Sequence, residues 1–146
     1  MTTTKLRVLI ALAALLLLVA TASLAQSQPS QAQKAPIQTT SAASGTEMFH
    51  SYCAPCHGKD GKGNGPAAAS LKNPPANLTQ LAKKNNGKFP TDHVANVLRS
   101  GVGGAHGSSD MPVWGPLFTQ VSGRDTGLVQ MRIANLVSYI ESLQEK

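Results

Sequence analysis

The stretch Cys53-Ala54-Pro55-Cys56-His57 contains both cysteines of the chain, and the interpretation of the rest of the sequence depends on it. Two thiols separated by two residues can each form a thioether to a vinyl group of haem, and the histidine that follows can then bind the iron from one side. We therefore predict one covalently attached haem c, held by Cys53 and Cys56, with His57 as an iron ligand.

Other uses of a C-x-x-C pair need features that this sequence lacks. A tetrahedral zinc site needs a second pair of ligands at similar spacing, whereas His50, His93 and His106 are scattered singly. A thioredoxin-like thiol pair belongs at the end of a strand in a βαβ pattern, but a helical pattern precedes Cys53 and glycines follow His57. Haem attachment is therefore favoured over zinc, a redox thiol pair or a plain disulfide.

Residues 1–25 have the pattern of a secretory signal peptide. Lys5 and Arg7 precede the apolar run Val8–Ala20, and small residues lead up to a suitable cleavage point after Ala25. The run is shorter than the roughly 20 residues that cross a membrane, so we rank cleavage ahead of retention as an anchor. We expect a periplasmic or otherwise exported protein, with a membrane tether as the alternative.

Residues 26–44 are rich in Gln, Ser, Ala, Thr and Pro and carry one charge, Lys34, which is typical of a flexible linker. Residues 45–146 are enough for one domain and too few for two. The formal net charge is +6, and without Lys5 and Arg7 it becomes 11 minus 7, or +4. These basic residues are dispersed, so we expect no nucleic-acid binding, although the charge can steer encounters with an acidic partner.

The domain shows helical patterns and no sustained alternation of apolar and polar residues, so we expect strands to be minor or missing. We predict a first helix that is capped by Thr46 and runs to Cys53. A glycine-rich loop over 58–66 and short helical turns over 67–71 and 78–84 should follow. A helix over 92–100 is predicted with Thr91 as its N-cap and Gly101 at its end.

The last segment predicts an amphipathic helix packed on the core. Its expected apolar stripe comprises Leu128, Met131, Leu136, Val137, Ile140 and Leu143. Arg132 and Asn135 are expected elsewhere on this helix. The chain has only six aromatic residues, so the apolar face of a haem would supply buried surface that the protein lacks.

A six-coordinate haem needs a second axial ligand, and a methionine thioether paired with histidine raises the reduction potential. Of the four methionines, Met1 leaves with the signal peptide, Met48 shares a helix with the attachment motif and Met131 lies on the predicted core stripe. Met111 remains, and we predict that it binds the iron opposite the histidine.

Met111 ends a glycine- and serine-rich run that is closed by Pro112, and it lies 54 residues after His57. The intervening chain is long enough to wrap around the edge of a haem. His106, in the same run, is the rival axial donor, since imidazole is the stronger ligand.

Trp114 and Arg99 each have two interpretations, one involving the haem and one not, whereas His50 and His93 have one. Trp114 could donate its indole N–H to a haem propionate or pack beneath the ring, and the two are rated equal. Arg99 could neutralise a propionate, although a solvent-facing position is commoner for arginine. His50 and His93 are expected to be solvated residues at helix surfaces.

Together these residues resemble the class I c-type cytochromes, which carry a single haem. The matching features, in order over residues 45–146, are a helix, C-x-x-C-H-G, a loop ending in Gly65-Pro66, Pro-Pro-Ala-Asn-Leu at 74–78, Met111-Pro112 and a last helix with Tyr139-Ile140. The resemblance implies an all-α fold, a small cytochrome c fold of about four to five helices wrapped around one covalent haem.

In that family the first and last helices cross, which here would bring Gly45 and Phe49 near Tyr139. The resemblance also implies that the carbonyl of Pro66 accepts a hydrogen bond from Nδ1–H of His57, which would fix the orientation of the ring.

The predicted function is electron transfer and not enzymatic catalysis: the iron cycles between ferric and ferrous while His57 and Met111 stay bound. Redox proteins, among them membrane complexes, are the expected donor and acceptor, and no small-molecule substrate is expected. One alternative is a haem subunit or tethered module of a larger oxidase or dehydrogenase. Another is a peroxidase-like haem enzyme, if Met111 leaves the iron open.

Overall fold

The computed structural model describes residues 37–101 and 110–145, and this part of the chain is helical and contains no strand. The all-α prediction is confirmed. The predicted signal peptide, residues 26–36 of the predicted linker and the rival ligand His106 lie outside the described residues.

The helical run that leads to the cysteine motif has three parts: α2 (Gly45–Met48), a π-helical turn η1 (Phe49–Cys53) and α3 (Ala54–His57). Its N-cap is Ser44, whose hydroxyl accepts a hydrogen bond from the backbone N–H of Glu47 at 3.1 Å. The predicted cap, Thr46, is wrong because this residue already lies inside the helix. The run continues past Cys53 and ends at Gly58, which has a φ of +80°.

The middle of the domain follows the predicted loop and short turns closely. After the loop come η2 (Ala68–Ser70), η3 (Leu78–Gln80) and α4 (Leu81–Lys84). The helix α5 (Thr91–Ser100) ends at Gly101, as predicted. Thr91 is not its cap, because Pro90 holds the N-cap position and Thr91 is the first helical residue.

Two helices complete the domain, α6 (Trp114–Val121) and α7 (Thr126–Ser142). The sequence patterns gave no prediction of α6. The N-cap of α7 is Asp125, whose carboxylate accepts a hydrogen bond from the backbone N–H of Leu128 at 3.1 Å.

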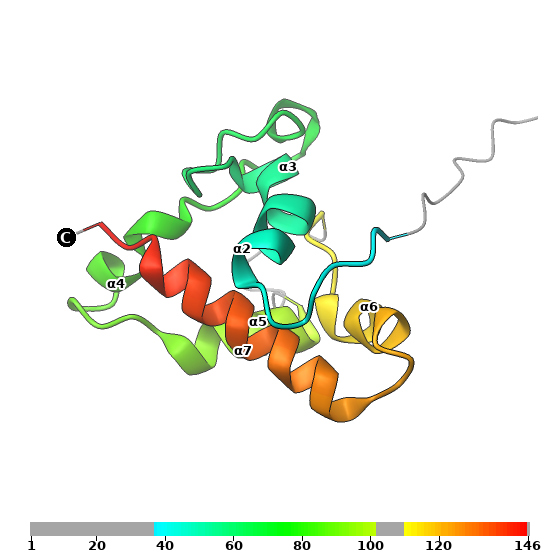
Figure 1. The fold of residues 1–146 in the computed structure, drawn as a ribbon. Helices are drawn as coiled ribbons and strands as arrows, with labels where there is room; N and C mark the ends of the chain where they lie inside the picture. Colours follow the sequence, from blue (N-terminus) through cyan, green and yellow to red (C-terminus); the bar gives the residue numbers. More distant parts are fainter. Residues whose placement is uncertain (1–36, 102–109, 146) are drawn as a thin grey trace, which may run out of the picture. The chain divides into compact units, whose positions relative to one another are not determined.

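Helices α2 and α7 cross, as the resemblance implies. Figure 1 shows α7 as the long orange-to-red helix with α2 lying against it. The rings of Phe49 and Tyr139 are 5.1 Å apart between centroids, and Gly45 contacts the backbone of Asn135. The predicted proximity of Gly45 and Phe49 to Tyr139 is confirmed.

The buried face of α7 differs from the predicted stripe at its N-terminal end. Met131 is 45% exposed and Leu128 is also exposed, whereas Ile133 is 1% exposed and Arg132 is 4% exposed. The buried side of the helix therefore runs through Arg132 and Ile133, and continues through Leu136, Val137 and Ile140. The predicted stripe is wrong at this end because Arg132, which we expected to lie away from the buried stripe, finds hydrogen-bond acceptors inside the domain.

The core packs these α7 residues against Met48, Phe49 and Phe118. Within the described residues, no helix combines the length and the apolar character needed to cross a membrane.

Candidate functional site

The C-x-x-C-H motif lies at the end of the first helical run, which brings its two thiols and its imidazole together. Cys53 is the last residue of the π-helical turn, and Cys56 and His57 are in the short helix that follows. Both thiols are free, Cys53 being buried and Cys56 half-buried. Single π-helical turns inside helices are frequent at functional sites. The motif thus offers two thiols and an imidazole within one continuous helical segment.

Burial controls the ionisation of the first thiol. It raises the pKa of Cys53 to about 12, and the neighbouring Cys56 contributes to the same shift. The thiol is therefore protonated at neutral pH. Redox-active C-x-x-C pairs have thiols with a lowered pKa, so the environment of Cys53 does not suit a thioredoxin-like role.

His57 is oriented by a backbone carbonyl. Its Nδ1 lies 2.9 Å from the carbonyl oxygen of Ala76. A carbonyl only accepts, so Nδ1 carries the proton and donates it, which leaves the lone pair on Nε2. Burial lowers the pKa of His57, although the Ala76 hydrogen bond acts in the opposite direction. The imidazole is thus held neutral, in the form that binds a metal.

The acceptor for His57 was expected to be Pro66, and this expectation is wrong. The 58–66 loop folds back along the helix end instead, where Gly63 N–H donates to His57 O at 2.7 Å and Gly65 N–H donates to Cys56 O at 3.0 Å. The segment after Pro75 approaches the imidazole, so that Ala76 supplies the carbonyl. Sequence reasoning singled out the Pro-Pro-Ala-Asn-Leu stretch but gave it no role.

The close return of the loop depends on glycine at position 65. A Cβ there would overlap the backbone oxygens of Ala54 and Pro55 and the carbonyl carbon of Cys56. The loop could not lie along the motif with a larger residue, so Gly65 is part of the site's construction.

Met111 is outside any helix, half-buried, and packed against the hydrophobic core. It lies three residues before Trp114, the first residue of α6. This is a position from which a side chain can be turned inward without the constraints of a helix. The run preceding it, residues 102–109 with His106, lies outside the described residues.

The other candidate side chains have mainly packing or surface roles. Trp114 is buried, with its ring stacked on Tyr52 at 5.2 Å between centroids. Arg99 is exposed and donates to the side chain of Gln130 at 3.2 Å. His50 and His93 are exposed, as expected.

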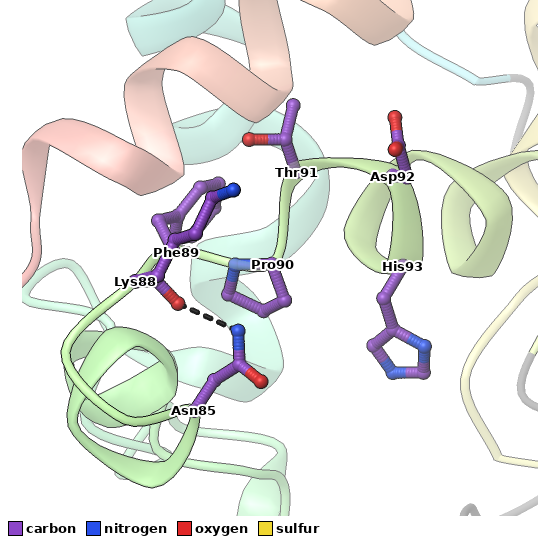
Figure 2. Close-up of a pocket in the computed structure, with 7 residues that line it drawn as sticks. All are labelled: Asn85, Lys88, Phe89, Pro90, Thr91, Asp92 and His93. Carbon is purple, nitrogen blue, oxygen red and sulfur yellow. Dashed lines mark hydrogen bonds between the residues drawn. The ribbon is translucent and has the colours of Figure 1, made fainter.

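Figure 2 shows a surface pocket of about 430 Å³ formed by Asn85 and residues 88–93. The amide of Asn85 donates to the carbonyl of Lys88 at 2.7 Å along one side of it. The Asp92 and His93 side chains point in opposite directions in this view. The pocket contains none of the residues of the attachment motif and is a separate feature of the surface.

The donor set fits a covalent haem. Two free thiols can form thioethers, the neutral imidazole presents Nε2 for iron, and a half-buried thioether is available at Met111. In residues 37–101 and 110–145 there is no group of three or more His, Cys, Asp or Glu that could hold a bare metal ion.

An all-α fold with crossed terminal helices and this motif define a c-type cytochrome domain, a haem-binding electron-transfer module. The family model described as "Cytochrome C oxidase, cbb3-type, subunit III" matches residues 40–140, and the chain belongs to that family. Searches of curated proteins and of solved structures found no match.

Proposed function

We propose that this domain is a one-electron carrier with a single haem c, bound through thioethers to Cys53 and Cys56 and ligated by His57 and Met111. The haem, when bound, supplies an iron centre that changes between ferric and ferrous. The residues of the chain hold this centre, set its ligand field and limit its contact with water. None of them is assigned a catalytic role.

The observation that carries the proposal is the hydrogen bond from Nδ1–H of His57 to the carbonyl of Ala76. It leaves the lone pair on Nε2, where it can bind iron, and strengthens the imidazole as a donor. Because the acceptor is a backbone group, the ring orientation does not depend on the rotamer of a second side chain. Fixed ligands reduce the rearrangement that accompanies electron transfer.

Met111 is proposed as the second axial ligand. Its soft thioether favours ferrous iron and raises the reduction potential relative to a second imidazole. Support comes from its half-buried position outside a helix, and Met131 offers a contrast because it is on the surface of α7.

The description of the family favours one alternative in particular, a haem subunit or module of an oxidase. Its words name a subunit of a cytochrome c oxidase, so the second candidate is that this domain works as a haem subunit or tethered module that delivers electrons to an oxidase. In either case the partners are redox proteins. Export rests on the signal-peptide pattern of residues 1–25.

Covalent attachment is tested by the mass of the mature protein after expression with a working haem-ligation system. We expect the mass of the chain without residues 1–25 plus one haem. Cys53→Ala and Cys56→Ala should each leave at most one thioether, and the double variant should retain no covalent haem. A colourless wild-type protein would refute the proposal.

Axial ligation is tested by the sulfur-to-iron charge-transfer band of the oxidised protein. Met111→Ala should abolish this band, while the matched variant Met131→Ala, at an exposed position, should keep it. A high-spin spectrum of the wild type would instead support an open-site haem enzyme.

Co-purification from native membranes separates the free carrier from the oxidase subunit. A protein that stays with an oxidase through purification is a subunit or module. A protein recovered alone, but reduced and oxidised by separate partners, is a free carrier.

A further inference from the structure

Arg132 is a buried cation on the core side of α7, at 4% exposure. Its guanidinium donates from Nε to Ser122 Oγ at 3.1 Å, from Nη1 to Thr40 Oγ1 at 3.0 Å and from Nη2 to Thr40 O at 2.8 Å. These acceptors are neutral. Burying a charge is costly unless it is well hydrogen-bonded, so these three bonds offset part of the cost of burying the Arg132 guanidinium.

Two of these bonds fix Thr40, which precedes the first helix. The hydroxyl of Thr40 lies 2.8 Å from Tyr52 Oη, and Tyr52 in turn donates its proton to the carbonyl of Gln38. Since the Tyr52 proton is used in that bond, the Thr40 hydroxyl must donate to Tyr52 while it accepts from Arg132. The hydrogen bonds run in one direction, from the guanidinium through Thr40 and Tyr52 to Gln38. Bonds in such a chain polarise and strengthen one another.

The ring of Tyr52 lies between two parts of the proposed haem site. Tyr52 directly precedes Cys53, and its ring stacks on Trp114 with 5.2 Å between centroids and 30° between planes. Trp114 lies three residues after Met111 and packs on Phe118. The stack therefore joins the helix that carries the attachment motif to the segment that carries the proposed second ligand.

We propose that Arg132, Thr40 and Tyr52 are positioning residues for the Met111 ligand. The hydrogen-bond chain fixes the ring of Tyr52, the ring holds Trp114, and Trp114 restrains the segment in which Met111 lies. The inference rests on the proposed ligation by His57 and Met111. Thr40 and its neighbours belong to the segment that was predicted from its composition to be a linker. The inference gives them a role in positioning a ligand of the site.

The test is the affinity of exogenous imidazole for the oxidised holoprotein, measured as loss of the sulfur-to-iron charge-transfer band when imidazole displaces Met111. Thr40→Val keeps the shape of the side chain and removes the hydroxyl, so the chain is broken between Arg132 and Tyr52. We expect imidazole to bind about fivefold more tightly, which corresponds to about 1 kcal/mol and to the loss of one net hydrogen bond. Tyr52→Phe, which keeps the ring, should act in the same direction and serves if Thr40→Val fails to fold.

Two controls separate positioning from general stability. Thr40→Ser keeps the hydroxyl and should restore an imidazole Kd within about twofold of the wild type. Ile133→Val removes one buried methylene elsewhere on the same helix, which lowers stability, and should leave the imidazole Kd unchanged.

An unchanged imidazole Kd in Thr40→Val and Tyr52→Phe, with only the unfolding free energy lowered, would overturn the positioning role and leave the Met111 ligation intact. A wild-type protein without the charge-transfer band would overturn the Met111 ligation itself, and this proposal with it. The spectrum of the wild type thus distinguishes the two failures before any variant is made.

Discussion

Gly45 in α2 lies so close to the backbone of Asn135 in α7 that position 45 has no room for a side chain. A Cβ there would overlap the carbonyl oxygen of Asn135 and come within 2.9 Å of Tyr139 Cβ. The two helices therefore approach each other through a glycine. Because α2 continues through the π-helical turn to Cys53, this crossing also fixes where the attachment motif lies relative to the core.

Gly45→Ala should accordingly destabilise the domain. The obstructing atoms belong to the backbone of a central helix and cannot move aside cheaply, so we expect a loss of at least about 1–3 kcal/mol. Chemical denaturation of the holoprotein measures it. Gly127→Ala is the control, because its nearest new contact is the Asp125 side chain at 3.2 Å and alanine favours the helix. Equal stability of the two variants would contradict the close crossing.

The buried face of α7 gives a second prediction. Ile133→Ala should cost about 2–5 kcal/mol, since it opens a cavity at a residue that is 1% exposed. Met131→Ala, at 45% exposure, should cost less than about 1 kcal/mol. Denaturant unfolding of both variants measures the two losses of unfolding free energy. A larger loss for Met131→Ala than for Ile133→Ala would support the stripe expected from the sequence alone.

That stripe shows what a sequence pattern can and cannot predict here. The existence of α7 and its contact with α2 followed from apolar spacing and from the family resemblance, and both are found. The orientation of its first turns did not follow, because Arg132 is buried by bonds to Thr40, 92 residues away, and to Ser122, which lies before the helix. A charged residue carries no local signal that such acceptors will be present.

The candidate site, too, has a part that could be predicted from the sequence and a part that could not. The C-x-x-C-H motif is local, so its three residues could be identified from the sequence and lie together in the structure. The carbonyl that orients His57 comes from Ala76, 19 residues away, and any residue type can supply a backbone oxygen. The helix α6 was not predicted, because it has only eight residues and Gly115 and Pro116 interrupt its helical pattern.

The third prediction concerns Gln144, whose side chain forms hydrogen bonds between the C-terminal end of the chain and the segment that follows Ala76. Its side-chain amide donates to Leu78 O at 2.7 Å and accepts from Ala82 N–H at 2.8 Å. Gln144→Ala leaves these partly buried backbone groups without that partner, which should cost about 1–3 kcal/mol of unfolding free energy.

A matched control for Gln144→Ala is Gln80→Ala. Gln80 makes an exposed bond of 3.4 Å to Glu145, so its loss should change the unfolding free energy by less than about 0.5 kcal/mol. If both variants behave alike in thermal or denaturant unfolding, the hydrogen bonds of Gln144 to Leu78 and Ala82 do not hold this segment.

The last prediction concerns acid. Burial lowers the pKa of His57 below its ordinary value of about 6.5, so the neutral, iron-binding form persists to lower pH in the folded domain than in the unfolded chain. The stability that this group contributes is thus complete above about pH 6.5 and is lost as the pH falls through the lowered pKa. In the oxidised holoprotein, burial and the proposed bond from Nε2 to iron both oppose protonation of this ring, so a visible-absorption titration should keep the low-spin spectrum through pH 6.5 and change only at more acid pH. His50→Gln, at an exposed histidine, should leave the midpoint where it is. A spectral change already centred near pH 6.5 would mean that the His57 ring is protonated as readily as a solvated imidazole, which contradicts its burial.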